Sequence, residues 1–279
     1  MKYYLDTVTT RRLAKYFDRM FIRENCFVSI HVISELLTDL NKDNFFIKKN
    51  TLNKIFENNI IIDWDQPHKK QYESFGFFNL IYKLNKDNVL FFYEKIKKAD
   101  SLDDFYNSID KYIDEYNKIQ NYDDSFESYF RGEMDAKIDD LKKAFPYSQA
   151  ISICDQMILY IKSSEEGFVN FLAVMYVKMA EDLYNSEMNK YQKRTIEEII
   201  KSYNGQIDIF LAVSGIYVLN KVPRKQQIAK NDFNDMYHLV YVNDNVIVSD
   251  DTLFEKYMKE IFPDRIISCD NFMILNNLC

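Results

Sequence analysis

Five short apolar runs rich in β-forming residues stand near the two ends of the 279-residue chain. They cover residues 3–5, 26–31, 60–64, 245–249 and 265–268. Segments with helical spacing lie between them, and strands that alternate with helices form βαβ units with parallel strands and right-handed crossovers. The sequence therefore predicts an α/β fold with a central, mostly parallel sheet whose strands come from both ends of the chain.

The middle of the chain has a different pattern. Between residues 67 and 222, apolar residues recur at the spacing of amphipathic helices. The clearest segments are residues 102–119, 126–145, 150–161, 168–184 and 190–203. We therefore divide the chain into an N-terminal part of the α/β domain (1–66), an all-helical insertion packed on the sheet (67–222) and a C-terminal part of the α/β domain (223–279).

Charge and composition argue against several classes of protein. The formal net charge of -7 argues against a protein coated in positive potential, but it permits a local basic rim. The chain begins without a signal-peptide pattern, and no segment approaches the ~18 uninterrupted apolar residues of a membrane span. We therefore expect a cytoplasmic protein without membrane contact. The four cysteines show no C-x-x-C spacing, which argues against a zinc site and a disulfide framework.

Four acidic residues occupy positions where a parallel sheet would gather them. Asp6 ends the first run, Glu35 lies in the first turn of the helix after the second run, and Asp235 lies near a helix start. Asp251 follows the run that ends at Ser249. Ligand sites in open α/β sheets form beyond the carboxyl ends of the strands, where the strand order reverses. We expect the four carboxylates to converge there.

Converged carboxylates repel one another and stay ionised only around a cation. For oxygen ligands this cation is a hard ion such as Mg²⁺ or Mn²⁺. Such an ion lowers the pKa of a bound water and neutralises charge on a phosphate. The predicted reaction is hydrolysis of a phosphodiester bond, which leaves a 3′-hydroxyl and a 5′-phosphate.

The acidic segments resemble the successive motifs of the PIN-domain ribonucleases. They are Tyr-Leu-Asp-Thr at 4–7, Val-Ser-Ile-His-Val-Ile-Ser-Glu-Leu-Leu at 28–37, Asp-Met-Tyr-His-Leu at 235–239 and Val-Ile-Val-Ser-Asp-Asp-Thr-Leu-Phe at 246–254. The resemblance covers residues 1–64 and 223–279 and says nothing of the insertion. It implies a three-layer PIN-like fold and a metal-dependent endoribonuclease.

The resemblance also implies roles for individual residues. The metal ligands, direct or through water, would be Asp6, Glu35, Asp235 and Asp251. Ser249 stands at the position of the family's motif hydroxyl, and Thr7 stands where a polar residue often follows the first acid. Two positions stay open, because Asp232 can take the place of Asp235 and Asp250 can take the place of Asp251.

Simpler interpretations exist for several of these residues. Asp6 can merely cap the following helix. Glu35 can be a solvated helix residue, although its apolar neighbours would make an unpaired carboxylate costly. Asp39 is interpreted as a surface charge, and His31 and His68 are interpreted as structural.

Candidate substrate-binding residues lie around the third acidic motif. His238, one turn after Asp235, can contact a phosphate, support a metal ligand or be an ordinary core histidine. Arg224, Lys225 and Lys230 precede the motif and form either a solvated loop or a contact to a phosphate backbone. The lysine pairs at 48–49 and 69–70 are weaker candidates of the same kind.

The leading hypothesis is a Mg²⁺- or Mn²⁺-dependent endoribonuclease that acts on RNA, with the insertion selecting the substrate. Since the PIN family includes toxins of bacterial toxin–antitoxin pairs, the resemblance also allows a toxin or antiviral role, a protein inhibitor of the antitoxin kind, or a homo-oligomer. One alternative is a catalytically silent PIN-like module that binds a protein through an exposed apolar patch on the insertion. The other is a structure-specific DNA nuclease.

Overall fold

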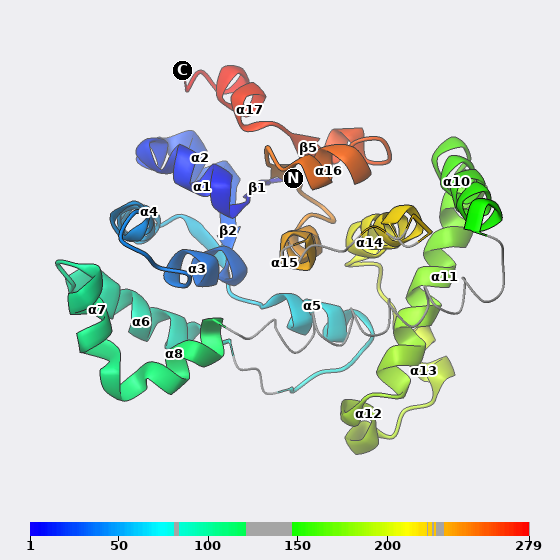
Figure 1. The fold of residues 1–279 in the computed structure, drawn as a ribbon, viewed down its shortest axis with the longest axis horizontal. Coiled ribbons are helices and arrows are strands. Elements are labelled where there is room, and N and C mark those ends of the chain that lie inside the picture. The colour runs from blue at the N-terminus through cyan, green and yellow to red at the C-terminus, as the bar shows by residue number, and fades with distance from the viewer. Residues whose placement is uncertain (81–83, 121–146, 222, 225, 227–231, 279) are drawn as a thin grey trace.

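A five-stranded sheet forms the centre of the computed structural model (Figure 1). The structure describes residues 1–279 except 81–83, 121–146, 222, 225, 227–231 and 279. Its strands are β1 (Tyr3–Leu5), β2 (Cys26–Ser29), β3 (Ile61–Asp63), β4 (Val246–Val248) and β5 (Ile266–Ile267). The strand order is β3-β2-β1-β4-β5, and all four pairings are parallel. The predicted α/β fold, with strands from both ends of the chain, is confirmed.

Helices occupy the remaining described chain in three groups. Those between the first strands are α1 (Thr7–Leu13), η1 (Ala14–Tyr16), α2 (Met20–Asn25), α3 (Ile30–Leu37) and α4 (Phe45–Glu57). Those after β3 are α5 (Pro67–Ser74), α6 (Lys86–Lys98), α7 (Leu102–Ile109), η2 (Asp110–Tyr112), α8 (Ile113–Gln120), α10 (Tyr147–Ser163), α11 (Glu165–Tyr184), α12 (Glu187–Gln192), α13 (Ile196–Lys201) and α14 (Asp208–Lys221). The C-terminal group is α15 (Asp232–Tyr237), η3 (His238–Tyr241), α16 (Thr252–Tyr257), η4 (Pro263–Arg265) and α17 (Cys269–Leu275).

The helices cover the sheet from two sides. From β1 the chain proceeds outward to β2 and β3 in one direction, whereas β4 leads to β5 in the opposite direction. Because parallel crossovers are right-handed, this reversal places the connecting helices on opposite faces. Figure 1 shows α1, α3 and α4 on one side of β1 and β2, and α14, α15 and α16 on the other. Helices α6 and α8 pack on α3, and α14 packs on α15 and α16.

The central strands are buried on both faces, as expected for a parallel sheet covered by helices. Tyr4, Leu5, Val28, Ile247 and Val248 are all completely buried. The carboxyl ends of these strands therefore lie directly next to the hydrophobic core.

The second strand is shorter than predicted. It ends at Ser29, whose hydroxyl accepts a hydrogen bond from the amide of Val32 and so caps α3. Because α3 begins at Ile30, Glu35 lies in its second turn, and the prediction that it lies in the first turn was wrong.

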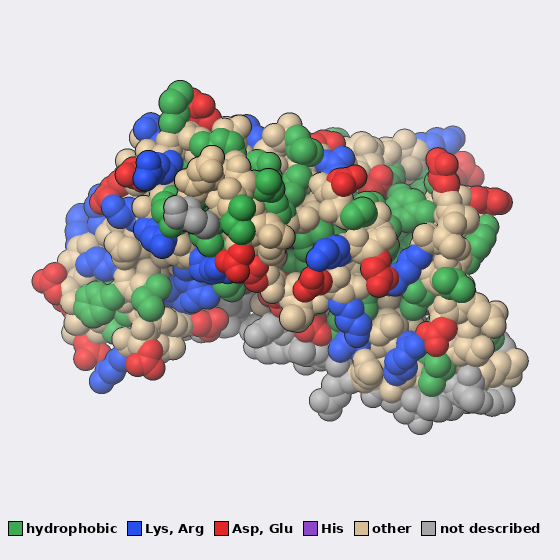
Figure 2. Space-filling model, turned by 90° about the horizontal axis from the view of Figure 1, so that it is seen from above, with side chains coloured by type: hydrophobic (Ala, Val, Ile, Leu, Met, Phe, Trp, Pro, Cys, Tyr) green, Lys and Arg blue, Asp and Glu red, His purple; other side chains and the backbone are tan. Residues whose placement is uncertain are grey.

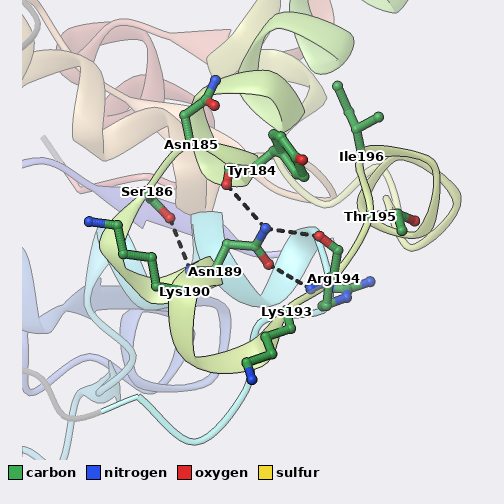
Figure 3. A pocket seen from close by; sticks show the side chains of 9 residues that line it. All are labelled: Tyr184, Asn185, Ser186, Asn189, Lys190, Lys193, Arg194, Thr195 and Ile196. Carbon is green, nitrogen blue, oxygen red and sulfur yellow. Dashed lines mark hydrogen bonds between the residues drawn. The ribbon is translucent and has the colours of Figure 1, made fainter.

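The helix predicted over 190–203 is two helices. Lys193 ends α12 in the left-handed conformation, with a φ of 53°. The carboxamide of Asn189 fixes the turn, as Figure 3 shows. It donates to the carbonyls of Tyr184 and Arg194 at 3.1 and 2.9 Å, and it accepts from the amide of Arg194 at 2.9 Å. Thr195 then starts α13 with a capping box.

The other predicted helices of the insertion have mixed outcomes. The segments at 150–161 and 168–184 correspond to α10 and α11, and the segment at 102–119 divides into α7, η2 and α8. The segment at 126–145 lies outside the described residues. In the part of the chain that the structure describes, no helix combines the length and the apolar character that a membrane span needs.

The centre and the edge of the sheet should differ sharply in their contribution to stability. We expect Ile247→Ala, in a completely buried strand, to lower the free energy of unfolding by about 2–5 kcal/mol, because it leaves a cavity. The matched change Ile61→Ala, on edge strand β3 where the side chain is 38% exposed, should cost less than about 1 kcal/mol. Urea denaturation measures both values. Equal losses would contradict the assignment of β4 to the core.

Candidate functional site

A pocket of about 240 Å³ lies beyond the carboxyl ends of β1 and β4. This is the point where the strand order reverses, and in open α/β sheets it is the usual place for a ligand. The pocket is lined by Asp6, Thr7, Val8, Arg11, Glu35, Asp39, Lys48, Asp235, His238, Asp251 and Phe254. The four acids predicted to converge therefore lie together, and Thr7 and His238 lie with them.

Asp6 leaves β1 and starts α1. Its Oδ1 accepts a hydrogen bond from the amide of Thr9 at 2.7 Å, so it does cap the helix, and it also faces the pocket. Burial raises the pKa of Asp6, against the opposing effects of the charge of His238 and of a hydrogen bond with Ser249. Ser249 is thus placed beside the first acid, although its own side chain is not part of the pocket lining.

Glu35 reaches the pocket from α3 and is held on several sides. The hydroxyl of Thr7 donates to its Oε2, and Nε2 of His238 lies 3.3 Å from the same oxygen. Nε2 of His31 lies 4.0 Å from the other oxygen, Oε1. Burial opposes ionisation, but the charges of the two histidines and the hydrogen bonds from His238 and Thr7 outweigh it and lower the pKa of Glu35 to about 2.

A buried hydrogen-bonded chain lies behind Glu35. The hydroxyl of Tyr4 lies 2.9 Å from Oγ of Ser29 and 2.6 Å from Nδ1 of His238. Burial lowers the pKa of His238, but the charges of Glu35, Asp6 and Asp235 and the hydrogen bond with Glu35 outweigh it and raise that pKa. Both the protonated imidazole and the neutral form that accepts from Tyr4 at Nδ1 carry a proton on Nε2, which faces Glu35. The chain Ser29–Tyr4–His238 thus ends in a donor aimed at the carboxylate. Burial raises the pKa of Tyr4 well above its ordinary value, so it acts as a neutral hydroxyl.

The two histidines and Glu35 could also hold a metal ion. One ligand atom from each of His31, Glu35 and His238 lies within 4.8 Å of the others. In the structure, however, Nε2 of His31 lies 3.0 Å from the carbonyl oxygen of Asn234, which requires an N–H at that nitrogen. An ion bound by all three would need that hydrogen bond to break. The structural interpretation of His31 overlooked its position four residues before Glu35, on one face of α3.

The other two acids come from the C-terminal part of the chain. Asp235 lies on α15, and burial together with the charges of Asp251, Glu35 and Asp232 raises its pKa to about 7, although His238 opposes this. Asp251 caps α16, since its Oδ1 accepts a hydrogen bond from the amide of Leu253 at 2.7 Å. The pocket therefore contains one strongly ionised acid and one that retains a proton near neutral pH.

Asp232 and Asp250, the alternative metal ligands proposed from the sequence, have other partners. Asp232 accepts a hydrogen bond from the hydroxyl of Tyr217. Asp250 pairs with Arg12 and accepts a hydrogen bond from the amide of Cys269 at 2.9 Å. Neither is part of the described lining of the pocket, whereas Asp235 and Asp251 both are.

The basic residues at the pocket differ from those proposed from the sequence. Arg224 pairs with Asp155 of α10 and is not part of the described lining. The candidates Lys225 and Lys230 lie outside the described residues. Arg11, which lines the pocket, was not singled out, although it stands one turn after Thr7 on α1.

Lys48 and Asp39 also line the pocket, at the C-terminal end of α3. The ammonium of Lys48 donates to the carbonyl oxygens of Glu35 and Thr38 at 2.9 and 2.7 Å. A cation at a helix C-terminus is favourable, and burial lowers the pKa of Lys48 against the opposing charges of Asp39 and Glu35. Lys48 therefore fixes the end of α3 that carries Glu35.

The pocket gathers carboxylates from four separate elements, and backbone amides, a hydroxyl or an imidazole contact three of them, Asp6, Glu35 and Asp251. Such an arrangement can bind one hard cation and a phosphate that the cation contacts. No family model, curated protein or solved structure matches the chain. Its function is therefore inferred from the geometry of the pocket.

Proposed function

We propose that this chain is a divalent-metal-dependent endoribonuclease of the PIN-like kind, which hydrolyses phosphodiester bonds of RNA. One observation carries the proposal: Asp6, Glu35, Asp235 and Asp251 line one pocket at the reversal of the strand order, although they come from distant parts of the sequence. Their order along the chain is also that of the acidic motifs that resemble the PIN family.

The donor atoms of the pocket fit Mg²⁺ or Mn²⁺. Both ions prefer carboxylate and water oxygens, and four carboxylates supply the oxygens. Burial raises the pKa of Asp6, and burial together with the charges of neighbouring acids raises that of Asp235, so ionising both carboxylates in this pocket is costly. A divalent cation would offset that cost.

In this mechanism Asp6 and Asp235 would be the principal ligands of the ion, and Glu35 and Asp251 would complete the site directly or through water. The ion would supply a water of lowered pKa and neutralise charge on the phosphate. Hydrolysis of this kind would add water to phosphorus and break the bond from phosphorus to O3′, so the products would carry a 3′-hydroxyl and a 5′-phosphate. Arg11, at the rim, is placed to pair with a phosphate oxygen.

A second candidate function is a protein-binding module, and one observation favours it. Helices α10 and α11 of the insertion carry exposed apolar side chains, namely Ile153, Met157, Leu159, Tyr160, Val169 and Val174. Figure 2 shows apolar side chains at the right-hand end of the molecule, where Figure 1 places these helices. An inhibitor of the antitoxin kind or a second copy of the chain would suit such a surface. This candidate predicts that metal is dispensable.

The nuclease is tested by incubating total cellular RNA with the purified protein in Mn²⁺, in Mg²⁺ and in EDTA. We expect cutting only with metal, and a loss of at least about a thousandfold in the Asp6→Asn, Asp235→Asn double variant, because removal of the ligands removes the ion. Asp244→Asn, an exposed acid outside the pocket, is the matched control and should cut normally. If no condition cuts RNA or single-stranded DNA, the protein-binding module becomes the better proposal.

The raised pKa of Asp235 should make the stability of the metal-free protein depend on pH. Its folded-state value of about 7 exceeds the ordinary 3.8, so stability is lost as the pH rises from about 4 to about 7. We expect the free energy of unfolding of Asp235→Asn at pH 8 to exceed that of the wild type by on the order of 2 kcal/mol, a value reduced to allow for the partial exposure of the side chain. Near pH 4 the difference should vanish.

Urea denaturation in EDTA at the two pH values measures this difference. Mn²⁺ should stabilise the wild type more at pH 8 than at pH 6, because binding must displace the proton. An Asp235→Asn variant that is less stable than the wild type at pH 8 would contradict the raised pKa.

Tyr4 should influence metal binding without touching the metal. Tyr4→Phe removes the hydroxyl that holds His238, and we expect Mn²⁺ affinity to fall about tenfold or more, together with a stability loss of about 1–3 kcal/mol. Tyr116→Phe is the matched control, because it removes a buried tyrosine hydroxyl that donates to Leu37. It should lose similar stability and keep its Mn²⁺ affinity, measured by titration calorimetry. Equal affinity losses in both variants would contradict a role for Tyr4 in positioning Glu35.

A further inference from the structure

A second pocket, of about 500 Å³, lies beyond the carboxyl end of β3, on the same edge of the sheet as the acidic pocket. Trp64 directly follows β3, and Gln66 directly precedes α5; both line this pocket. Asn79, Asn85 and other residues complete the wall. The pocket thus combines a large aromatic ring with several carboxamides.

The polar groups of this pocket are suited to an uncharged ligand. Lys69 pairs with Asp65 and, at 3.8 Å, with Glu73, so two acids and one lysine line the pocket and the lining does not favour an anionic group. Gln66 is only 4% exposed, and its Nε2 finds no hydrogen-bond partner among the described residues. Because this nitrogen is itself buried, the carboxamides that a ligand can reach are those of Asn79 and Asn85, both of which are exposed and line the pocket.

The aromatic ring of Trp64 favours a planar ligand. Trp64 is partly buried against the core, and the ammonium of Lys86 lies 5.2 Å from its ring centroid. A planar heterocycle with hydrogen-bonding edges suits a tryptophan beside carboxamides, and unpaired bases of single strands are recognised by aromatic stacking and edge contacts. The Lys86 ammonium would lie close to the phosphate of such a nucleotide.

The two pockets are close enough to bind the same nucleic-acid strand. β3 lies two strands from β1, which is about 10 Å at the usual spacing of ~4.8 Å. Helix η3 connects them, because His238 at its start lines the acidic pocket and the hydroxyl of Tyr241 at its end donates to the carbonyl of Asp65 at 2.8 Å.

We propose that the pocket at Trp64 binds one unpaired nucleobase of a single-stranded nucleic acid whose backbone crosses the acidic pocket. The second half of this inference rests on the proposed nuclease function, whereas base binding itself does not. The pocket would hold the strand in register and make cleavage depend on the base at that position.

The first test uses the fluorescence of Trp64, the only tryptophan of the sequence. Wild-type protein is titrated in EDTA with adenosine and uridine 5′-monophosphates, with their deoxy forms, and with ribose 5-phosphate. We expect the nucleotides to quench the emission and ribose 5-phosphate to leave it unchanged. Quenching by the ribonucleotides alone assigns RNA as the source of the base, and quenching by both sets assigns either nucleic acid. An unchanged emission with all nucleotides overturns the proposal.

The second test measures binding of a labelled, short single-stranded RNA by fluorescence anisotropy, in the Asp6→Asn, Asp235→Asn background that prevents cutting. We expect Trp64→Ala to weaken binding about tenfold, as for the loss of one stacked base, and Trp64→Phe to restore part of it. Tyr191→Ala, at an 86% exposed aromatic on α12, is the matched control and should bind normally.

The two proposals fail in different ways. Metal-dependent cutting of RNA by the wild type, with no quenching and no effect of Trp64→Ala, overturns the base pocket and leaves the nuclease standing. Quenching by nucleotides without any cutting supports the base pocket and contradicts the nuclease.

Discussion

The site depends first on the pairing of β1 with β4. The ladder joins Tyr3 to Val246 and Leu5 to Val248, so backbone hydrogen bonds connect the two ends of the chain. The residues that follow the ladder are Asp6 on one strand and Ser249 on the other, and they are hydrogen-bonded to each other. Because this pairing lies at the reversal of strand order, Asp6 faces the acidic pocket that forms there, and Ser249 lies beside it.

The gathered acids differ in charge because their surroundings differ. Glu35 receives hydrogen bonds from Thr7 and His238 and stays ionised, whereas Asp235 lies among other carboxylates and keeps a proton near neutral pH. The buried hydroxyl of Tyr4 fixes the imidazole that supports Glu35. The pocket therefore combines an ionised, hydrogen-bonded carboxylate, Glu35, with a second acid, Asp235, whose pKa lies near neutral pH.

The sheet and the acids at its edge could be predicted from the sequence because both follow from local sequence patterns. A short apolar run between helices predicts a buried strand, and an acid at its end predicts a position on the sheet edge. The break at Lys193 was not predicted, because the apolar residues keep their helical spacing across it, whereas the turn is stabilised by hydrogen bonds from the Asn189 carboxamide to the backbone of Tyr184 and Arg194. Tyr4 and Arg11 were not singled out either, because their importance depends on which side chains face them after folding.

The helical insertion is bound to the sheet edge at both of its ends. It begins after β3 with α5, next to the pocket that holds Trp64, and the chain returns to β4 through α15 and η3, which carry Asp235 and His238. Since α5 also packs on η3, the start of the insertion contacts the helix on which His238 lies.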